Sequence, residues 1–110
     1  MPDSYFGTTI YTVLPGDTLY RIAYNHTTTV ENIMKFNNIV NPNIIYPFQQ
    51  IVIPWSPPET VIYTVRPGDS LYSIAKKFGT SIKELVMFNY LTPPYVIYPN
   101  QHLVVVPSML

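Results

Sequence analysis

Few side chains in this sequence could do acid–base chemistry. Hydrolysis of a glycosidic bond normally needs two carboxylates placed across the bond. The available pairs are Asp17 with Glu31 in the first half of the chain and Asp69 with Glu84 in the second half. The two halves repeat each other, and Glu31 aligns with Lys83, so the pairs do not correspond. The sequence therefore predicts no catalytic residues and no enzymatic activity.

Other kinds of reactive site have no sequence signature here. The chain contains no cysteine, so neither a disulfide nor a thiolate metal site is available. His26 and His102 stand alone, outside any metal-ligand spacing, and are expected to be ordinary core or surface histidines. No Gly-x-Ser-x-Gly motif, Cys-His combination or phosphate loop occurs. We expect no metal and no cofactor.

The charge pattern limits the choice of partner. Six basic and six acidic residues give a net charge of zero, and Lys and Arg form no run. This pattern argues against nucleic acid and favours a neutral partner. No stretch approaches the 18 or more apolar residues of a membrane span, and Met1–Ser4 does not open a signal peptide. We expect no membrane partner, and either use in the cytoplasm or an excised or leaderless form of the protein.

The repeat defines the organisation of the chain. Residues 11–53 align with residues 63–105 at a constant offset and without a gap. A period of this length marks repeated supersecondary units, and with two copies we expect each to fold by itself. The predicted domains are residues 9–55 and 61–108, joined by a Pro-rich linker at residues 56–60. The prolines between residues 54 and 60 favour an extended, semi-rigid spacer.

Hydrophobic periodicity predicts the same elements in each copy. Alternating strands are expected at residues 10–14 and 61–65, and final strands at residues 50–53 and 102–106. Apolar positions at helical spacing predict a first helix with the stripes Leu19, Ile22, Ala23, His26 and Leu71, Ile74, Ala75, Phe78. A second, short helix has the stripes Val30, Ile33, Met34 and Ile82, Leu85, Val86. The predicted fold is α+β: two tandem βααβ units, each with a two-stranded antiparallel sheet and two helices on one face.

Helix ends can also be predicted. Asp17 and Asp69 stand where the N-cap of the first helix is expected. Ser81 with Glu84 forms a capping-box pattern at the second helix, and Thr29 forms a weaker version of it in the first copy.

These residues carry a family signature: Tyr-Thr-Val-x-Pro-Gly-Asp-(Thr/Ser)-Leu-x-x-Ile-Ala, then Asn37 or Asn89, then Ile-Tyr-Pro-x-Gln and a short apolar strand. The chain resembles a tandem pair of LysM domains over about nine-tenths of its length. The resemblance implies a module that binds N-acetylglucosamine-containing glycans, either peptidoglycan or chitin and its oligomers, without catalysis. The absence of cysteine looks bacterial. The resemblance further leads us to expect a location at the cell wall, spore or extracellular surface. We also expect the protein to be a monomer in the absence of glycan.

The resemblance also implies where the ligand lies, in a shallow groove between two loops of each unit. In the first copy the implied residues are Gly16, Asp17, Thr18, Leu19 and Tyr20, facing Asn41, Pro42, Asn43, Ile44 and Ile45. In the second copy they are Gly68, Asp69, Ser70, Leu71 and Tyr72, facing Pro93, Pro94, Tyr95, Val96 and Ile97. Backbone groups would pair with the acetamide while an apolar notch takes its methyl group. The alternative is a coat or scaffold protein that uses these surfaces for assembly.

Two features depart from the family pattern. Phe48 and Asn100 stand where a Pro-Gly turn is usual, and the turn needs a positive φ that Asn tolerates and Phe does not. We expect a type I turn or local strain at Phe48. Gly79 suits the left-handed end of the first helix and the β-branched Thr27 does not, so the first copy is expected to close this helix differently.

Several polar and aromatic residues have two interpretations. For Asp17 and Asp69 we favour capping over direct sugar contact, and for Asn37 and Asn89 a structural role at the end of the second helix. The remaining interpretations concern aromatic residues. For Tyr20 and Tyr72, stacking on a sugar and covering the core are equally open. Packing is favoured for Tyr46 and Tyr98, and for Trp55 between the repeats. Tyr90 and Tyr95 occur only in the second copy and are the expected source of any difference in affinity between the copies.

Overall fold

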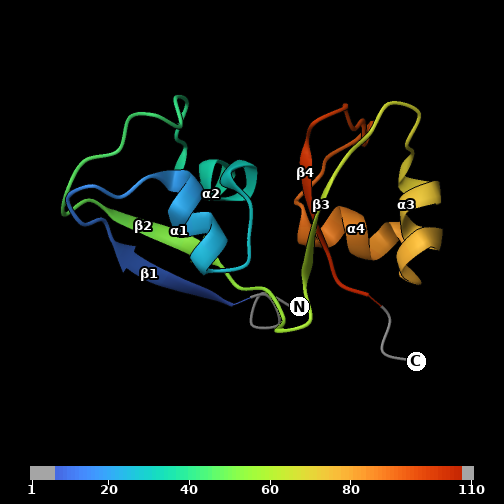
Figure 1. Cartoon of the computed structure of the whole chain (residues 1–110), viewed down its shortest axis with the longest axis horizontal. Coiled ribbons are helices and arrows are strands. Elements are labelled where there is room, and N and C mark those ends of the chain that lie inside the picture. The colour runs from blue at the N-terminus through green and yellow to red at the C-terminus, as the bar shows by residue number, and fades with distance from the viewer. Residues whose placement is uncertain (1–6, 108–110) are drawn as a thin grey trace. The chain divides into compact units, whose positions relative to one another are not determined.

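The computed structural model describes residues 7–107, and the chain divides after Ser56 into two compact units. Each unit runs strand, helix, helix, strand, and its two strands pair antiparallel into a separate two-stranded sheet (Figure 1). In each unit both helices pack on the sheet from one side (Figure 1). The predicted α+β fold of two tandem βααβ units is confirmed.

The first unit contains β1 (Thr8–Thr12), α1 (Leu19–Asn25), α2 (Val30–Asn37) and β2 (Gln50–Pro54). Its register pairs Thr8 with Pro54 at one end of the sheet and Thr12 with Gln50 at the other. The second unit contains β3 (Val61–Thr64), α3 (Leu71–Phe78), α4 (Ile82–Phe88) and β4 (His102–Val105). Its register runs from Val61 opposite Val105 to Thr64 opposite His102.

The strand limits differ slightly from the prediction. The strand predicted at residues 10–14 lies at Thr8–Thr12, because the chain beyond Thr12 bends into the turn that precedes α1. Val13 nevertheless stays attached to the second strand, since its N–H donates to Gln49 O at 2.8 Å. Pro54 extends β2 by one residue, while β3 and β4 each end one residue before the predicted limit.

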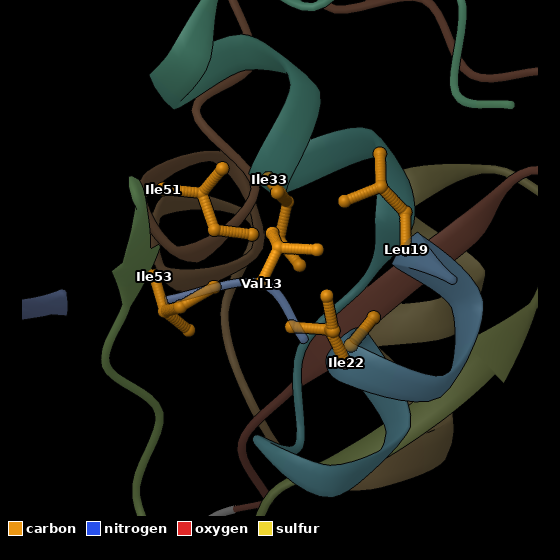
Figure 2. Packing of buried hydrophobic residues seen from close by; sticks show 7 residues of the cluster. Val13, Leu19, Ile22, Ile33, Ile51 and Ile53 are labelled. Atoms are coloured by element: carbon orange, nitrogen blue, oxygen red, sulfur yellow. The ribbon is translucent and has the colours of Figure 1, made fainter. Parts of the chain in front are cut away.

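The core of the first unit brings together the sheet and both helices (Figure 2). Its members are apolar side chains at most 3% exposed: Val13, Leu19, Ile22, Ala23, Ile33, Ile51 and Ile53. Burying one such Leu, Ile or Val side chain stabilises a fold by about 1.5–3 kcal/mol. Because the unit has no disulfide, this cluster is the main source of its stability. The predicted stripe is confirmed, and its last member, His26, is half-buried and packs on Tyr11.

The second core repeats the first with Val65, Ile74, Ala75, Leu85, Leu103 and Val105. Leu71 and Phe78 pack against it from partly exposed positions, as the predicted stripe requires. Ile82 does not follow the prediction, because it starts α4 and is 42% exposed. The expectation that Ile82 points inward was therefore wrong.

The N-caps of the first helices are not Asp17 and Asp69. They are Thr18, whose hydroxyl accepts the Arg21 N–H at 3.1 Å, and Ser70, which accepts the Ser73 N–H at 3.0 Å. The physical reason is that the aspartate carboxylates are held one residue earlier, where they accept hydrogen bonds from the preceding strand and turn.

The caps of the second helices match the prediction more closely. Thr29 accepts the Asn32 N–H at 3.0 Å, and Ser81 accepts the Glu84 N–H at 3.1 Å. Glu84 in turn accepts the Thr80 hydroxyl at 2.7 Å. A full reciprocal box forms instead at α3, where Ser73 Oγ also accepts the Ser70 N–H.

Helix closure is the same in both copies, contrary to expectation. Thr27 adopts φ +54° and Gly79 adopts φ +70°. The following N–H groups close the helices alike, from Thr28 to Ala23 O at 3.0 Å and from Thr80 to Ala75 O at 2.9 Å. Thr28 is also buried. Burial and hydrogen bonding of the next residue hold Thr27 in a conformation that a β-branched side chain disfavours.

Candidate functional site

The two loops of each candidate site lie at the same end of their sheet. Since Thr12 pairs with Gln50, the loop leaving β1 and the loop entering β2 start side by side. Further hydrogen bonds join them, because Val13 O accepts the Phe48 N–H at 2.6 Å. In the second unit Val65 O accepts the Asn100 N–H at 2.7 Å in the same way. The fold therefore joins the two predicted loops of each unit where they meet the sheet.

The first loop begins with a tight turn. In the first unit the Asp17 N–H donates to Leu14 O at 3.0 Å, Pro15 is the first central residue and Gly16 the second. Gly16 has φ +90°, which a type II turn requires at that position. A Cβ at Gly16 would meet no atom within 4 Å, so the backbone angle and not space favours glycine. Gly68 has the same angle and surroundings.

A buttress of one tyrosine and one aspartate holds this turn against the strand. Tyr11 Oη donates to Asp17 Oδ2 at 2.5 Å, and the same oxygen accepts the Leu14 N–H at 2.9 Å. The Tyr11 and Leu14 hydrogen bonds lower the pKa of the Asp17 carboxyl, and the bond to Asp17 raises the pKa of Tyr11. The second unit repeats the buttress with Tyr63 and Asp69.

Beyond the turn, the residues of the first loop differ in what they can offer a ligand. The Thr18 and Ser70 hydroxyls cap helices. Leu19 is 1% exposed and belongs to the core, so it supports the site from beneath. Tyr20 and Tyr72 are 70% and 67% exposed. The core-cover interpretation of these two tyrosines was therefore wrong, and their rings are open to solvent.

The second loop of the first unit is a neutral, partly apolar segment. The Asn41 side chain accepts the Asn43 N–H at 2.9 Å, and Asn41 O accepts the Ile44 N–H at 3.1 Å. Pro42 is half-buried. Ile45 packs against the core, which leaves Ile44, 50% exposed, as the apolar side chain on the surface.

The corresponding loop of the second unit carries an extra aromatic ring. Pro93 and Pro94 are exposed, and the Tyr95 N–H donates to Thr92 O at 2.8 Å. Tyr95 is 43% exposed and Val96 is 49% exposed, while Ile97 packs against the core. Tyr90, the other tyrosine specific to this copy, is half-buried and follows Asn89, the C-cap of α4.

Each candidate site thus combines an exposed tyrosine in the first turn of the helix that follows the first loop, Tyr20 in α1 or Tyr72 in α3, with an exposed aliphatic side chain on the second loop. The second loop has no charged residue. Such a surface suits a neutral ligand with both apolar and hydrogen-bonding faces. The family model described as "LysM domain" matches residues 11–54 and 63–106, which include both loops of each unit. The chain belongs to the LysM domain family. LysM domains bind N-acetylglucosamine-containing glycans such as peptidoglycan.

Similar proteins include cell-wall enzymes. The N-acetylmuramoyl-L-alanine amidase sle1 of Staphylococcus epidermidis is 38% identical over 86% of this chain, and that of Staphylococcus saprophyticus is 40% identical over 84%. The chain spans about a third of the length of either relative. Among solved structures, the spore cortex-lytic enzyme SleL of Bacillus megaterium is 28% identical, with a TM-score of 0.47 over 96% of this chain and 24% of the enzyme.

The aromatic residues that follow the second LysM loop are more exposed than predicted. Tyr46 and Tyr98 are both 65% exposed, so the packing interpretation was wrong. Phe48 has φ +71° and Asn100 has φ +74°, and in both turns the N–H of the next glutamine closes the turn at 3.1 Å. A type I turn has negative φ at both central residues, so the positive φ of Phe48 excludes it. The backbone strain that was the other expectation at Phe48 is therefore present. The sequence shows that Phe48 lies in this turn, but only the structure shows that its side chain is exposed.

The asparagines that end the second helix of each unit are structural, as predicted. Asn89 Nδ2 donates to Leu85 O and Val104 O, both at 2.8 Å, and its Oδ1 accepts the Val104 N–H at 2.7 Å. Asn37 joins α2 to Val52 in the same way. Each amide ties a helix to the outer edge of the last strand.

Within residues 7–107, no group of three or more His, Cys, Asp or Glu side chains is arranged to hold a metal ion. No helix in this range combines the length and the apolarity needed to cross a bilayer.

Proposed function

We propose that this chain is a non-catalytic binding module for N-acetylglucosamine-containing glycans, with one groove in each LysM unit. The observation that carries the proposal is that two loops start at the same end of each sheet, and that the second loop carries exposed apolar side chains and no charged residue. The backbone of the loops would donate and accept hydrogen bonds at the acetamide, and Ile44 or Val96 would contact its methyl group.

The proposed groove residues are those of the two loops, with their contributions ranked by exposure. In the first unit Tyr20 and Ile44 face solvent, whereas Leu19 and Asp17 shape the loop from within the fold. In the second unit Tyr72, Tyr95 and Val96 are exposed. The additional ring of Tyr95 supports a higher affinity of the second groove, because Asn43 occupies the matching place in the first.

Binding without cleavage is the role we assign to this chain. The amidase relatives are about three times as long as the part that this chain matches, so their catalytic activity is not transferred to it. Within one unit the carboxylates do not recur as a pair, and the Asp17 carboxylate is already engaged by Tyr11 and Leu14. We place the protein at a cell wall or another extracellular glycan surface, as a monomer in the absence of glycan.

The decisive experiment is a site-resolved NMR titration of the intact chain. N-acetylglucosamine oligomers should shift the amide signals of Thr18 and Ile44 and of Ser70 and Val96, while glucose oligomers, which lack the acetamide, leave these signals unchanged. Ile44→Asp, which places a charge on an already exposed side chain, should remove the response of the first groove alone. Equal groove shifts with both sugar series would overturn the proposal.

Three further measurements define the role. A muropeptide titrated beside a chitin oligomer identifies the preferred glycan. Incubation of the chain with either polymer should release no fragments, and a cleavage product would refute the assignment as a binding module. Light scattering with and without oligomer tests the monomer, since self-association in the absence of sugar would favour the assembly alternative.

A further inference from the structure

A concave site lies in the first unit, at the other end of the sheet from the two loops of the proposed groove. It has a volume of about 400 Å³, within the range of small-molecule pockets. Three segments of the first unit line it: the start of β1, the residue that follows α1, and the end of β2 with the two residues after it. The lining residues are Gly7, Thr8, Thr9, His26, Ile53, Pro54, Trp55 and Ser56.

The sheet register separates this pocket from the groove. Thr8 pairs with Pro54 at the pocket end, and Thr12 pairs with Gln50 at the groove end. The four residue steps from Thr8 to Thr12 span roughly 14 Å at the rise of an antiparallel strand. A ligand in the pocket therefore makes contacts of its own instead of extending those of the groove loops.

The chemistry of the lining is neutral and amphipathic. No Asp, Glu, Lys or Arg is among the lining residues that the structure describes. Trp55 is 47% exposed and is the sole tryptophan of the chain, and Thr8 and Thr9 are exposed hydroxyl residues beside it. An indole offers a flat apolar face, while threonine hydroxyls donate and accept hydrogen bonds.

His26 adds a hydrogen-bond acceptor that the second unit lacks. Its Nδ1 lies 2.8 Å from Ile22 O, and because a carbonyl only accepts, Nδ1 carries the hydrogen. In the neutral ring Nε2 is then an acceptor. Phe78 occupies the matching position and packs on Tyr63 as His26 packs on Tyr11, each pair with ring centroids 5.4 Å apart at 71°. Packing alone is served equally by phenylalanine, so the imidazole adds only its polar nitrogen.

We infer that this pocket is a second carbohydrate site, which takes one uncharged pyranose ring against Trp55 with its hydroxyls directed to His26 and the threonines. The C–H face of a pyranose is apolar and packs on an aromatic ring, while its hydroxyl edge needs donors and acceptors. The site goes beyond the proposed groove function, because it recognises the ring and its hydroxyls and needs no acetamide. Glucose and N-acetylglucosamine oligomers should therefore both enter it.

Tryptophan fluorescence tests this inference, because its signal comes from Trp55 alone. In the intact chain, titration with glucose oligomers should shift the emission while the groove amides of Thr18 and Ile44 stay unchanged. His26→Phe copies the second unit and should preserve the fold. It should weaken the affinity measured by fluorescence about three- to tenfold, because one hydrogen bond to the sugar is lost. Trp55→Ala should abolish the response of the His26 ring signals in NMR, whereas Trp55→Phe should retain part of it.

The outcomes separate this site from the groove. Groove shifts with N-acetylglucosamine oligomers, without any response of Trp55 or His26 to either sugar, would overturn the second site and leave the proposed function intact. A Trp55 response without groove shifts would support the second site and refute the groove. An unchanged affinity in a correctly folded His26→Phe chain would refute the assigned role of the imidazole, and silence at both sites would refute both proposals.

Discussion

Tyr11 Oη lies 2.5 Å from Asp17 Oδ2, and the same oxygen of Asp17 accepts the Leu14 N–H at 2.9 Å. One carboxylate therefore fastens the turn before α1 to the strand that precedes it. Tyr63 and Asp69 repeat the arrangement with the Arg66 N–H. Because this turn forms one side of the proposed groove, the protonation state of the aspartate is expected to affect both stability and binding.

The pH dependence follows from the direction of the pKa shifts. Hydrogen bonds lower the pKa of Asp17 and Asp69 below the ordinary 3.8, so their contribution is present above that pH and is lost as the pH falls through the lower folded value. The pKa of Tyr11 and Tyr63 is raised above 10.0, so the tyrosine contribution is present below pH 10.0 and is lost as the pH rises through the higher folded value.

We predict that Tyr11→Phe combined with Tyr63→Phe moves the midpoint of acid unfolding to higher pH, because the aspartates lose their main stabilising donor. Thermal unfolding followed by circular dichroism from about pH 2 to about pH 7 measures this shift. Tyr24→Phe, at a 74% exposed position, serves as the control and should follow the parent chain. Identical acid limbs for the double variant and the parent would show that the buttress does not stabilise the turn.

We predict that Asn89→Ala destabilises the second unit by about 2–4 kcal/mol, since it leaves the Val104 N–H and C=O without their side-chain partner and each buried unsatisfied group costs about 1–3 kcal/mol. Asn37→Ala should cost less, because Asn37 is half-buried and water can replace its amide. Denaturant unfolding of both variants measures the difference. Asn25→Ala, at an exposed helical position, should stay within about 0.5 kcal/mol of the parent, and an equally small effect at Asn89 would contradict the bridging role.

We predict that Phe48→Gly stabilises the first unit by about 0.5–1 kcal/mol. Relief of the positive φ is partly offset by the greater freedom of glycine in the unfolded chain. Phe48 is 72% exposed, so little packing is lost. The matched change Asn100→Gly should be close to neutral, because Asn tolerates this conformation. A lower melting temperature for Phe48→Gly would show that the phenyl ring stabilises the turn more than its backbone angle strains it.

We predict that duplication increases binding to polymers more than to short sugars. If both grooves engage one long glycan, the second event is intramolecular and avidity can exceed single-site affinity by about 10² to 10⁴. The intact chain and the halves 1–56 and 57–110 should differ little on a short oligomer and greatly in pull-down with insoluble peptidoglycan or chitin. If the correctly folded halves bind the polymer as tightly as the intact chain does, the duplication does not act through avidity.

The sequence by itself determined the repeat, the order of elements and most of the core. Apolar residues at helical spacing identify Leu19, Ile22 and Ile33, because a helix in a small unit must bury one face. The Pro-Gly-Asp motif likewise predicts the turn before the first helix of each unit. These features depend on local periodicity and turn chemistry, which neighbouring residues along the chain specify.

Only the tertiary structure decided which side chains are available at the site. Whether Asp17 caps a helix or binds Tyr11 depends on how the turn folds back on β1, six residues earlier. The exposure of Tyr20 and Tyr46, and the positive φ at Thr27 and Phe48, depend in the same way on contacts made across the unit. The pocket beside Trp55 also depends on tertiary contacts, since the start of β1, the end of β2 and His26 line it together. Burial and strain are properties of the packed unit, and local sequence leaves them open.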